Sequence, residues 1–164
     1  SLRHAREGAM PSYYTWTVGC QMNIADSDRL AAALEQLGYE RSPAAEDADI
    51  VVLNSCVVRQ GAEEKVVARL DSLKSHKRRR PDATVALMGC MVGPRTEALR
   101  KRFPHVDFFM RPQDFRALID FAEERQGLAC DSDLALLGPT RPQVSTFVPI
   151  IHGCDEFCTF YQAT

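Results

Sequence analysis

Short apolar runs that alternate with amphipathic stretches constrain the fold of this chain more than any other feature. Four runs combine apolar, β-branched and aromatic side chains, as strands do. They cover residues 13–18, 49–53, 84–88 and 106–110. The stretches between them repeat apolar residues three or four apart, as Leu30, Leu34 and Leu37 do, which is the spacing of one helix face. Strands that alternate with helices favour parallel pairing through right-handed crossovers, so the sequence predicts an α/β fold.

The predicted sheet has about five strands when residues 39–41 are counted as a short second strand. Because residues 49–53 are a nearly continuous apolar run, we expect an open parallel sheet with helices on both faces. The flavodoxin-like strand order 2-1-3-4-5 fits this pattern. In that order the first, third and fourth strands are neighbours, about 4.8 Å apart.

Capping residues set the expected limits of the helices. The first helix should begin at Asp26 or Ser27, because short polar side chains cap helix starts, and it should stop at Gly38. The second helix should fray over the basic residues 77–80 and end before the proline that follows them. Pro94 should occupy the first position of the third helix, where its missing N–H is not needed.

Three of the six cysteines share one setting, directly after a predicted strand. Cys20, Cys56 and Cys90 follow the first, third and fourth strands, and each precedes a predicted helix. Loops at the carboxyl ends of neighbouring parallel strands lie at one edge of the sheet, which is where such folds bind ligands. A helix N-terminus also favours the thiolate, which is the form that ligates metal. We therefore expect the three thiols to converge on one spot.

The chemistry of such a thiol group has three interpretations. Unrelated buried cysteines are the simplest, since free cysteine is among the most buried residue types, but the shared setting of the three argues against it. Zinc stays possible, although structural zinc prefers four closed ligands, often in CxxC pairs, and the sequence contains no CxxC. Three widely spaced thiolates suit an iron-sulfur cluster with one open iron better.

Composition and charge exclude several classes of protein. Hydrophobic residues make up 45% of the 164 residues and charged residues 26%, which is enough apolar material for a core. Twenty lysines and arginines against 22 aspartates and glutamates give a net charge of −2, so any contact with RNA must be local. No apolar run approaches the ~20 residues of a membrane span, and no cleavable signal pattern begins the chain. We expect a soluble, cytoplasmic protein with no membrane partner.

The residues around the three thiols resemble the N-terminal domain of the radical-SAM methylthiotransferases. The resemblance covers roughly residues 13–124 and rests on three motifs. These are Gly-Cys-Gln-Met-Asn at residues 19–23, Asn-Ser-Cys-Val-Val-Arg at residues 54–59 and Met-Gly-Cys-Met at residues 88–91. The first motif resembles the tRNA-modifying, MiaB-like branch more than the branch that modifies a ribosomal protein.

The resemblance implies a full-length enzyme that adds a methylthio group to C2 of N6-isopentenyladenosine next to the anticodon. It implies that Cys20, Cys56 and Cys90 hold an auxiliary 4Fe-4S cluster involved in sulfur delivery. A second 4Fe-4S cluster in a central barrel would bind S-adenosyl-L-methionine (SAM). The implied partners are the tRNA anticodon arm and donors of sulfur and electrons. Two alternatives stay open: a non-catalytic metal- or RNA-binding module of the same fold, and a methylthiotransferase acting on another tRNA base or a ribosomal protein.

The end of the chain resembles the start of the family's CxxxCxxC motif, whose three thiolates bind the cluster that cleaves SAM. Cys154 and Cys158 match the first two positions, but Tyr161 stands at the third. A phenol is a poor replacement for a thiolate on iron. We therefore expect no complete second cluster in this chain and no catalytic activity from it alone.

Four segments are expected along the chain. Residues 1–10 should be a flexible start, and residues 11–126 should form the cluster-binding domain. Glycine, proline and polar residues make residues 127–145 a linker. Residues 146–164 begin with an apolar run typical of a strand, and we interpret them as the truncated start of the radical-SAM domain.

Four polar residues flank the predicted cluster: Gln21, Asn23, Asn54 and Arg59. Their amide and guanidinium groups could donate hydrogen bonds to cluster sulfide, or they could cap their own loops, and both interpretations stay open. The basic run at residues 74–80 is either a solvated helix end that complements the helix dipole or a phosphate-contact patch. The first of these two is the simpler interpretation.

Overall fold

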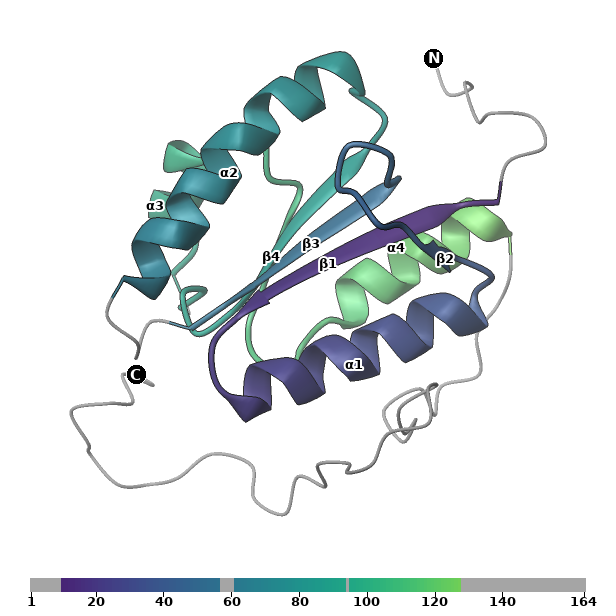
Figure 1. The fold of residues 1–164 in the computed structure, drawn as a ribbon, viewed down its shortest axis with the longest axis horizontal. Coiled ribbons are helices and arrows are strands. Elements are labelled where there is room, and N and C mark those ends of the chain that lie inside the picture. Colours follow the sequence, from purple (N-terminus) through teal and green to yellow (C-terminus); the bar gives the residue numbers. More distant parts are fainter. Residues whose placement is uncertain (1–9, 57–60, 94, 128–164) are drawn as a thin grey trace.

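The computed structural model describes residues 10–56, 61–93 and 95–127. In this part of the chain five strands form one sheet, and four helices cover it (Figure 1). The strands are β1 (Ser12–Val18), β2 (Glu40–Arg41), β3 (Ile50–Ser55), β4 (Thr84–Gly89) and β5 (Phe108–Met110). The helices are α1 (Gln21–Gln36), α2 (Ala62–Arg79), α3 (Glu97–Arg102) and α4 (Arg116–Gln126).

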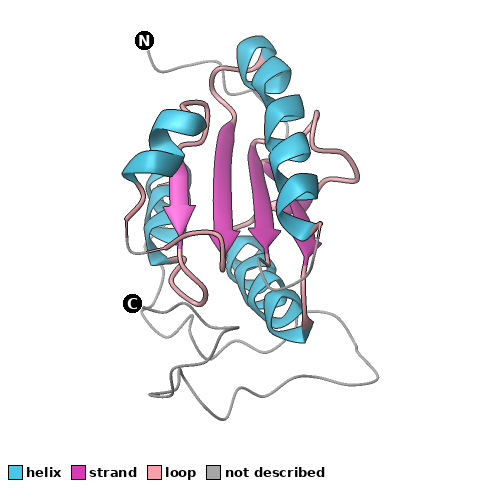
Figure 2. Ribbon diagram, turned by 90° about the vertical axis from the view of Figure 1, so that its left-hand side faces the viewer, coloured by secondary structure: helices cyan, strands magenta, loops and turns pink. Residues whose placement is uncertain are grey.

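The sheet is parallel throughout, with the strand order β2-β1-β3-β4-β5. Figure 2 shows the strand arrows pointing the same way, with helices on either side of the sheet. The predicted α/β fold and its 2-1-3-4-5 order are therefore confirmed. Because β1, β3 and β4 are neighbours, their carboxyl ends lie side by side.

Two apolar clusters fill the space between the sheet and its helices. Alternate residues of β3 contribute to the two clusters. Ile50 and Val52 pack on the side of α1 and α4, whereas Val51 and Leu53 pack on the side of α2 and α3. Every residue of β3 and β4 is buried, which explains their nearly uninterrupted apolar sequences.

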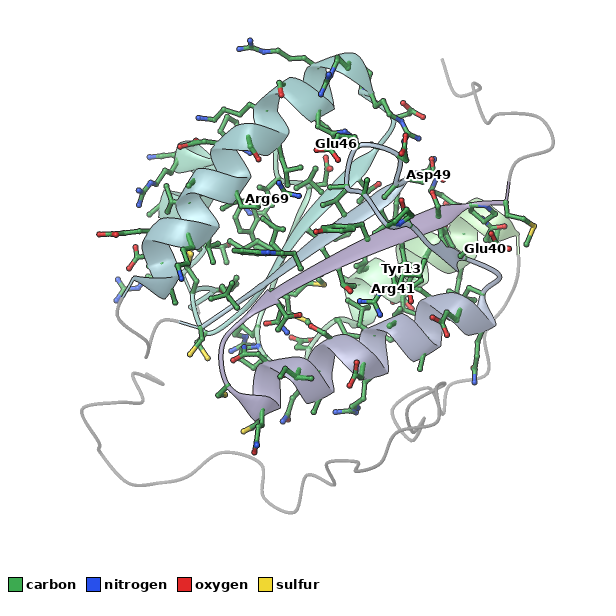
Figure 3. All side chains as sticks on the ribbon, in the orientation of Figure 1. Tyr13, Glu40, Arg41, Glu46, Asp49 and Arg69 are labelled. Atoms are coloured by element: carbon green, nitrogen blue, oxygen red, sulfur yellow. The ribbon has the colours of Figure 1, made fainter. Side chains whose placement is uncertain are left out.

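Side chains of β1 show the same two sides. The fully buried Tyr13, labelled in Figure 3, belongs to the cluster on the α1 side. Its hydroxyl donates a hydrogen bond to Glu35 Oε1 at 2.6 Å. Tyr14 points to the other side, where the guanidinium of Arg69 from α2 lies 5.9 Å from the centre of its ring. The two neighbouring tyrosines therefore anchor helices on opposite faces of the sheet.

Two predicted helix limits are wrong, the start of α1 and the start of α3. Helix α1 begins at Gln21, so Asp26 and Ser27 lie inside it, buried against the sheet, and do not cap it. Helix α2 runs into the basic residues and ends at Arg79, before the proline at position 81, as predicted. Helix α3 begins only at Glu97, so Pro94, which lies outside the described residues, is not its first residue. The predicted stop of α1 at Gly38 is correct, because that glycine has a φ of +83° just beyond the last turn.

None of the helices in the described part of the chain is long and apolar enough to cross a membrane.

Candidate metal centre

The register of the sheet brings the three cysteine-bearing loops to one edge. Val18, Ser55 and Gly89 are paired across β1, β3 and β4 and form one row at the carboxyl ends of the strands. Cys56 and Cys90 directly follow this row, and the Cys90 N–H extends the pairing by donating to Ser55 O at 2.9 Å. Cys20 comes one residue further along, after Gly19. The three cysteines therefore leave the same end of three neighbouring strands.

Cys20 is the N-cap residue of α1, with an extended backbone (φ −92°, ψ −178°) and an exposed side chain. Its backbone N–H donates to Asn23 Oδ1 at 3.2 Å, and its thiol donates to the same oxygen at 3.3 Å. Cys56 and Cys90 differ from the prediction that each directly precedes a helix, because α2 begins only at Ala62 and α3 only at Glu97.

The side chains of Cys56 and Cys90 lie against one another. Cys56 is 2% exposed, and Cys90 is half-buried. Burial raises the pKa of the Cys90 thiol above its ordinary value, and the neighbouring side chains of Cys56 and then Cys20 raise it further. A hydrogen bond between the Cys90 and Cys56 side chains acts in the same direction. The Cys90 thiol is thus within electrostatic reach of both other thiols.

The thiols are near one another without being arranged as a finished ligand shell. Among the residues that the structure describes, no three His, Cys, Asp or Glu side chains are spaced to hold a metal ion. Thiolates are the donors that an iron-sulfur cluster needs, and holding one at this edge would require movement of thiol side chains or their loops. The exposed Cys20 is the side chain with the most freedom to do this.

Glycines precede two of the cysteines because the loops approach each other closely. Gly89 has a φ of +110°, and a Cβ atom there would lie 2.2 Å from Ser55 O. A Cβ atom on Gly19 would lie 2.2 Å from Asn23 Oδ1 and 2.8 Å from Cys56 Cβ. Neither position has room for a side chain, so both glycines are required for the packing of the cysteine loops.

A buried polar network lies behind the thiols. Asn23 Nδ2 donates to Asn54 Oδ1 at 3.0 Å and to Ser55 O at 3.2 Å. Asn54 Nδ2 donates to Asn23 O at 2.8 Å and to Ser27 Oγ at 2.9 Å, and the Ser27 hydroxyl is 2.7 Å from Thr17 Oγ1. Sequence reasoning missed the parts played by Ser27 and Thr17, because only the fold brings α1, β1 and β3 together here.

The other predicted site residues have different positions. Gln21 is exposed at the first residue of α1, beside Cys20. Arg59, Cys154, Cys158 and Tyr161 lie outside the described residues, as do the expected flexible start, most of the linker and the radical-SAM segment.

Three of the six basic residues at positions 74–80, at the end of α2, form ion pairs. Lys74 contacts Asp71, Lys77 contacts Asp107 and Arg80 contacts Asp49, with N–O distances of 2.5 to 2.7 Å. His76 is buried, at 3% exposure. These contacts favour a structural helix end over a phosphate-contact patch.

A parallel α/β domain with three cysteines at the carboxyl edge of its sheet is the class of protein that this geometry defines. The model of a family described as "Uncharacterized protein family UPF0004" matches residues 12–111, which include all five described strands and the three cysteines. The chain belongs to this family.

Curated relatives carry the name tRNA-2-methylthio-N(6)-dimethylallyladenosine synthase. One from Dehalococcoides mccartyi (strain ATCC BAA-2266 / KCTC 15142 / 195) is 44% identical over 151 residues, or 92% of this chain and 34% of the relative. Another from Herpetosiphon aurantiacus is 41% identical over 149 residues, or 90% of this chain and 34% of the relative. Among solved structures, a CheY-like protein (tadZ) from Pseudomonas aeruginosa PAO1 has a TM-score of 0.48 and 14% identity, covering 74% of this chain and 97% of that one. The chain spans about a third of the length of the curated relatives.

Proposed function

We propose that this chain is the auxiliary-cluster domain of a tRNA methylthiotransferase. In this proposal Cys20, Cys56 and Cys90 hold a 4Fe-4S cluster. The single observation that carries it is that three cysteines follow the carboxyl ends of three neighbouring parallel strands. Relatives more than 40% identical over nine-tenths of the chain, whose names include 2-methylthio and dimethylallyladenosine, support the reaction class.

The substrate in this proposal is a tRNA whose adenosine next to the anticodon carries the N6-isopentenyl (dimethylallyl) group. The methylthio group is added at C2 of that adenosine. The full-length enzyme would use SAM and a second 4Fe-4S cluster, together with donors of sulfur and electrons. The net charge of −2 offers no general attraction for RNA, so the anticodon arm must be bound by local contacts or by the rest of the enzyme.

Three thiolates suit a 4Fe-4S cluster whose fourth iron is open to an exogenous ligand. When bound, the auxiliary cluster would supply the sulfur chemistry for the methylthio group. The chain's own fold places the three cysteines at one edge of the sheet, with Cys20 as the N-cap residue of α1. Cys56 is buried and Cys90 is half-buried, so two of the three proposed ligands are less accessible to water than the exposed Cys20.

The domain boundaries belong to the same proposal. Residues 11–126 form the auxiliary-cluster domain, residues 127–145 link it, and residues 146–164 begin the radical-SAM domain. Cys154 and Cys158 would be two ligands of the SAM-cleaving cluster, but Tyr161 replaces the third thiolate. We therefore expect no SAM cleavage by this chain alone.

Anaerobic reconstitution with iron and sulfide tests the proposal. We expect about four irons and four sulfides per chain, and loss of this cluster in Cys20→Ala, Cys56→Ala and Cys90→Ala. Cys154→Ala and Cys158→Ala are the matched controls and should keep it. Retention of the cluster by all three edge variants would contradict the proposal. Tight zinc binding without uptake of iron and sulfide would favour a non-catalytic metal-binding module instead.

A further inference from the structure

The amide side chains of Asn23 and Asn54 contact all three cysteine-bearing loops. Asn23 Oδ1 accepts the Cys20 N–H, and Asn23 Nδ2 donates to the carbonyl of Ser55, the residue before Cys56. The Ser55 carbonyl also accepts the N–H of Cys90. Asn54 Oδ1 lies close to Gly89, the residue before Cys90. A Cβ atom added to Gly89 would be only 2.7 Å from it.

The side-chain amides of Asn23 and Asn54 use all of their hydrogen-bond donors within the protein. A side-chain amide has two N–H donors. Both donors of Asn23 are matched by two protein acceptors, and both donors of Asn54 are matched likewise. The two side chains belong to residues only 3% and 1% exposed. Neither amide has a donor left for cluster sulfide.

We propose that Asn23 and Asn54 are positioning residues that fix the Cys20 loop against the Cys56 loop and thereby set the separation of the three thiolates. This inference rests on the proposed function and excludes a direct contact between either amide and the cluster. Exchanging O and N of the Asn23 amide would place NH2 against the Cys20 N–H and oxygen against two other oxygens. The amide orientation is therefore determined by its partners.

Only one of the two Cys20 hydrogen bonds depends on the protonation of sulfur. The Sγ–H donor is lost when the thiol becomes a thiolate, whereas the backbone N–H donor remains. Ligation of Cys20 would then free its side chain to turn towards Cys56 and Cys90 while Asn23 still holds its backbone. Asn23 would therefore fix the backbone of the Cys20 loop and leave the Cys20 sulfur able to move.

The test compares Asn23→Ala and Asn54→Ala with the wild-type chain in two measurements. The first is the affinity of the metal-free chain for Co²⁺, read from thiolate-to-cobalt absorption. The second is the rate at which a chelator removes iron from the reconstituted cluster without oxygen. We expect each variant to weaken Co²⁺ binding about 10- to 100-fold and to lose iron correspondingly faster, as loss of residues that orient metal ligands does.

The double variant adds a readout that general loss of stability would not give. Because the two amides act as one unit, Asn23→Ala with Asn54→Ala should weaken Co²⁺ binding by much less than the product of the single effects. Val85→Ala is the control, since Val85 is fully buried in β4 and lies towards the opposite end of the strand from Cys90. It should lower the melting temperature without changing Co²⁺ affinity. If Asn23→Ala does not fold, Asn23→Asp keeps an acceptor for the Cys20 N–H, removes both donors, and should weaken binding similarly.

The outcomes separate this inference from the proposed function. Wild-type chain that takes up no iron-sulfur cluster overturns the proposed function, while the Co²⁺ comparison still judges the positioning of the thiols. Asparagine variants that match the wild-type chain in both Co²⁺ affinity and iron loss overturn the inference and leave the proposed function standing. Wild-type chain that binds neither cobalt nor a cluster overturns both.

Discussion

Asn23 donates a hydrogen bond to Asn54 across 3.0 Å, although 31 residues separate them, and the chain contains no other asparagine. The bond joins the first turn of α1 to the end of β3. Because a buried polar group left without its partner costs about 1–3 kcal/mol, the pair stabilises this junction only while both amides are present. Two cysteine loops are thereby built as one structural unit.

Alanine at Gly89 should destabilise the domain more than alanine at Gly93. Gly89 has a φ of +110°, and its new Cβ would lie 2.2 Å from the carbonyl oxygen of Ser55. The Cβ position of Gly93, three residues after Cys90, has no heavy atom within 4 Å. We expect Gly89→Ala to lower the free energy of unfolding by at least about 2 kcal/mol and Gly93→Ala to change it by less than about 0.5 kcal/mol. Urea unfolding measures both, and equal changes would contradict the assigned close approach.

The sheet could be predicted from the sequence because its signals are local. Residues of β3 and β4 are almost continuously apolar, because a strand that is buried on both faces needs apolar side chains on both faces. The alternation of these strands with amphipathic helices then restricted the topology to parallel pairing, and the placement of the cysteines at one edge followed from the order of the strands. None of these steps required contacts between distant residues.

The start of α1 could not be predicted because its signals are long-range. Ser27 looks like a helix cap when the sequence is read locally, but its hydroxyl contacts Thr17 and Asn54 on two different strands. The helix instead begins beside Cys20, a residue type that seldom caps helices. The same limitation hid the reason for the glycine before Cys90, since the atom that a side chain would meet belongs to β3.

Removal of the Asp49 carboxylate should destabilise the fold without affecting the cysteine edge. Asp49 lies just before β3, at the amino end of the sheet (Figure 3). Its Oδ1 is 2.5 Å from Arg80 Nη2, and its Oδ2 accepts the Ser12 N–H at 2.9 Å. Because Asp49→Ala removes the acceptor of both Arg80 Nη2 and the Ser12 N–H, we expect a loss of roughly 2 kcal/mol in the free energy of unfolding.

The ion pair of Arg116 and Asp120 on α4 is the control for that prediction. Its side chains are 49% and 55% exposed, whereas those of Arg80 and Asp49 are 19% and 28% exposed. Water and salt screen exposed pairs, so Asp120→Ala should change the free energy of unfolding by no more than about 0.5 kcal/mol. Cluster uptake by Asp49→Ala should match that of the wild-type chain, and a loss of uptake would show that the two ends of the sheet are coupled.

The three edge thiols should react with an alkylating reagent in a fixed order when no metal is bound. Cys20 is exposed at a helix N-terminus and should react first. Cys90 is half-buried and its pKa is raised, so a smaller fraction of it is thiolate at neutral pH. Cys56, at 2% exposure, should react last.

Mass spectrometry of digests taken during the reaction with iodoacetamide gives the rate at each cysteine. Reconstitution with iron and sulfide should protect all three edge cysteines together, because each would then be a ligand. Protection of Cys20 alone, or faster reaction of Cys56 than of Cys20, would be inconsistent with the proposed cluster and with the burial of these thiols.

Stability should fall as the pH drops through the range in which histidine gains a proton, and His76 should be one cause. His76 is 3% exposed, and burial lowers its pKa below the ordinary value of about 6.5. The positive charges of Arg80, Arg79 and Lys77 lower it further, against an opposing effect of Glu46. The unfolded chain therefore binds the proton more readily than the folded one, so this contribution to stability is complete above about pH 6.5 and is lost as the pH falls towards the folded-state pKa.

Urea unfolding of wild-type chain and His76→Leu between about pH 7.5 and pH 5.5 measures this effect. The variant should lose less stability than the wild-type chain over that range. Part of the decrease in the free energy of unfolding with falling pH should remain in the variant, because burial also lowers the pKa of His105. Val85→Ala, which removes apolar contacts without removing a titrating group, should keep the wild-type slope at a lower free energy. An unchanged slope in His76→Leu would mean that His76 binds its proton equally well in the folded and unfolded chain.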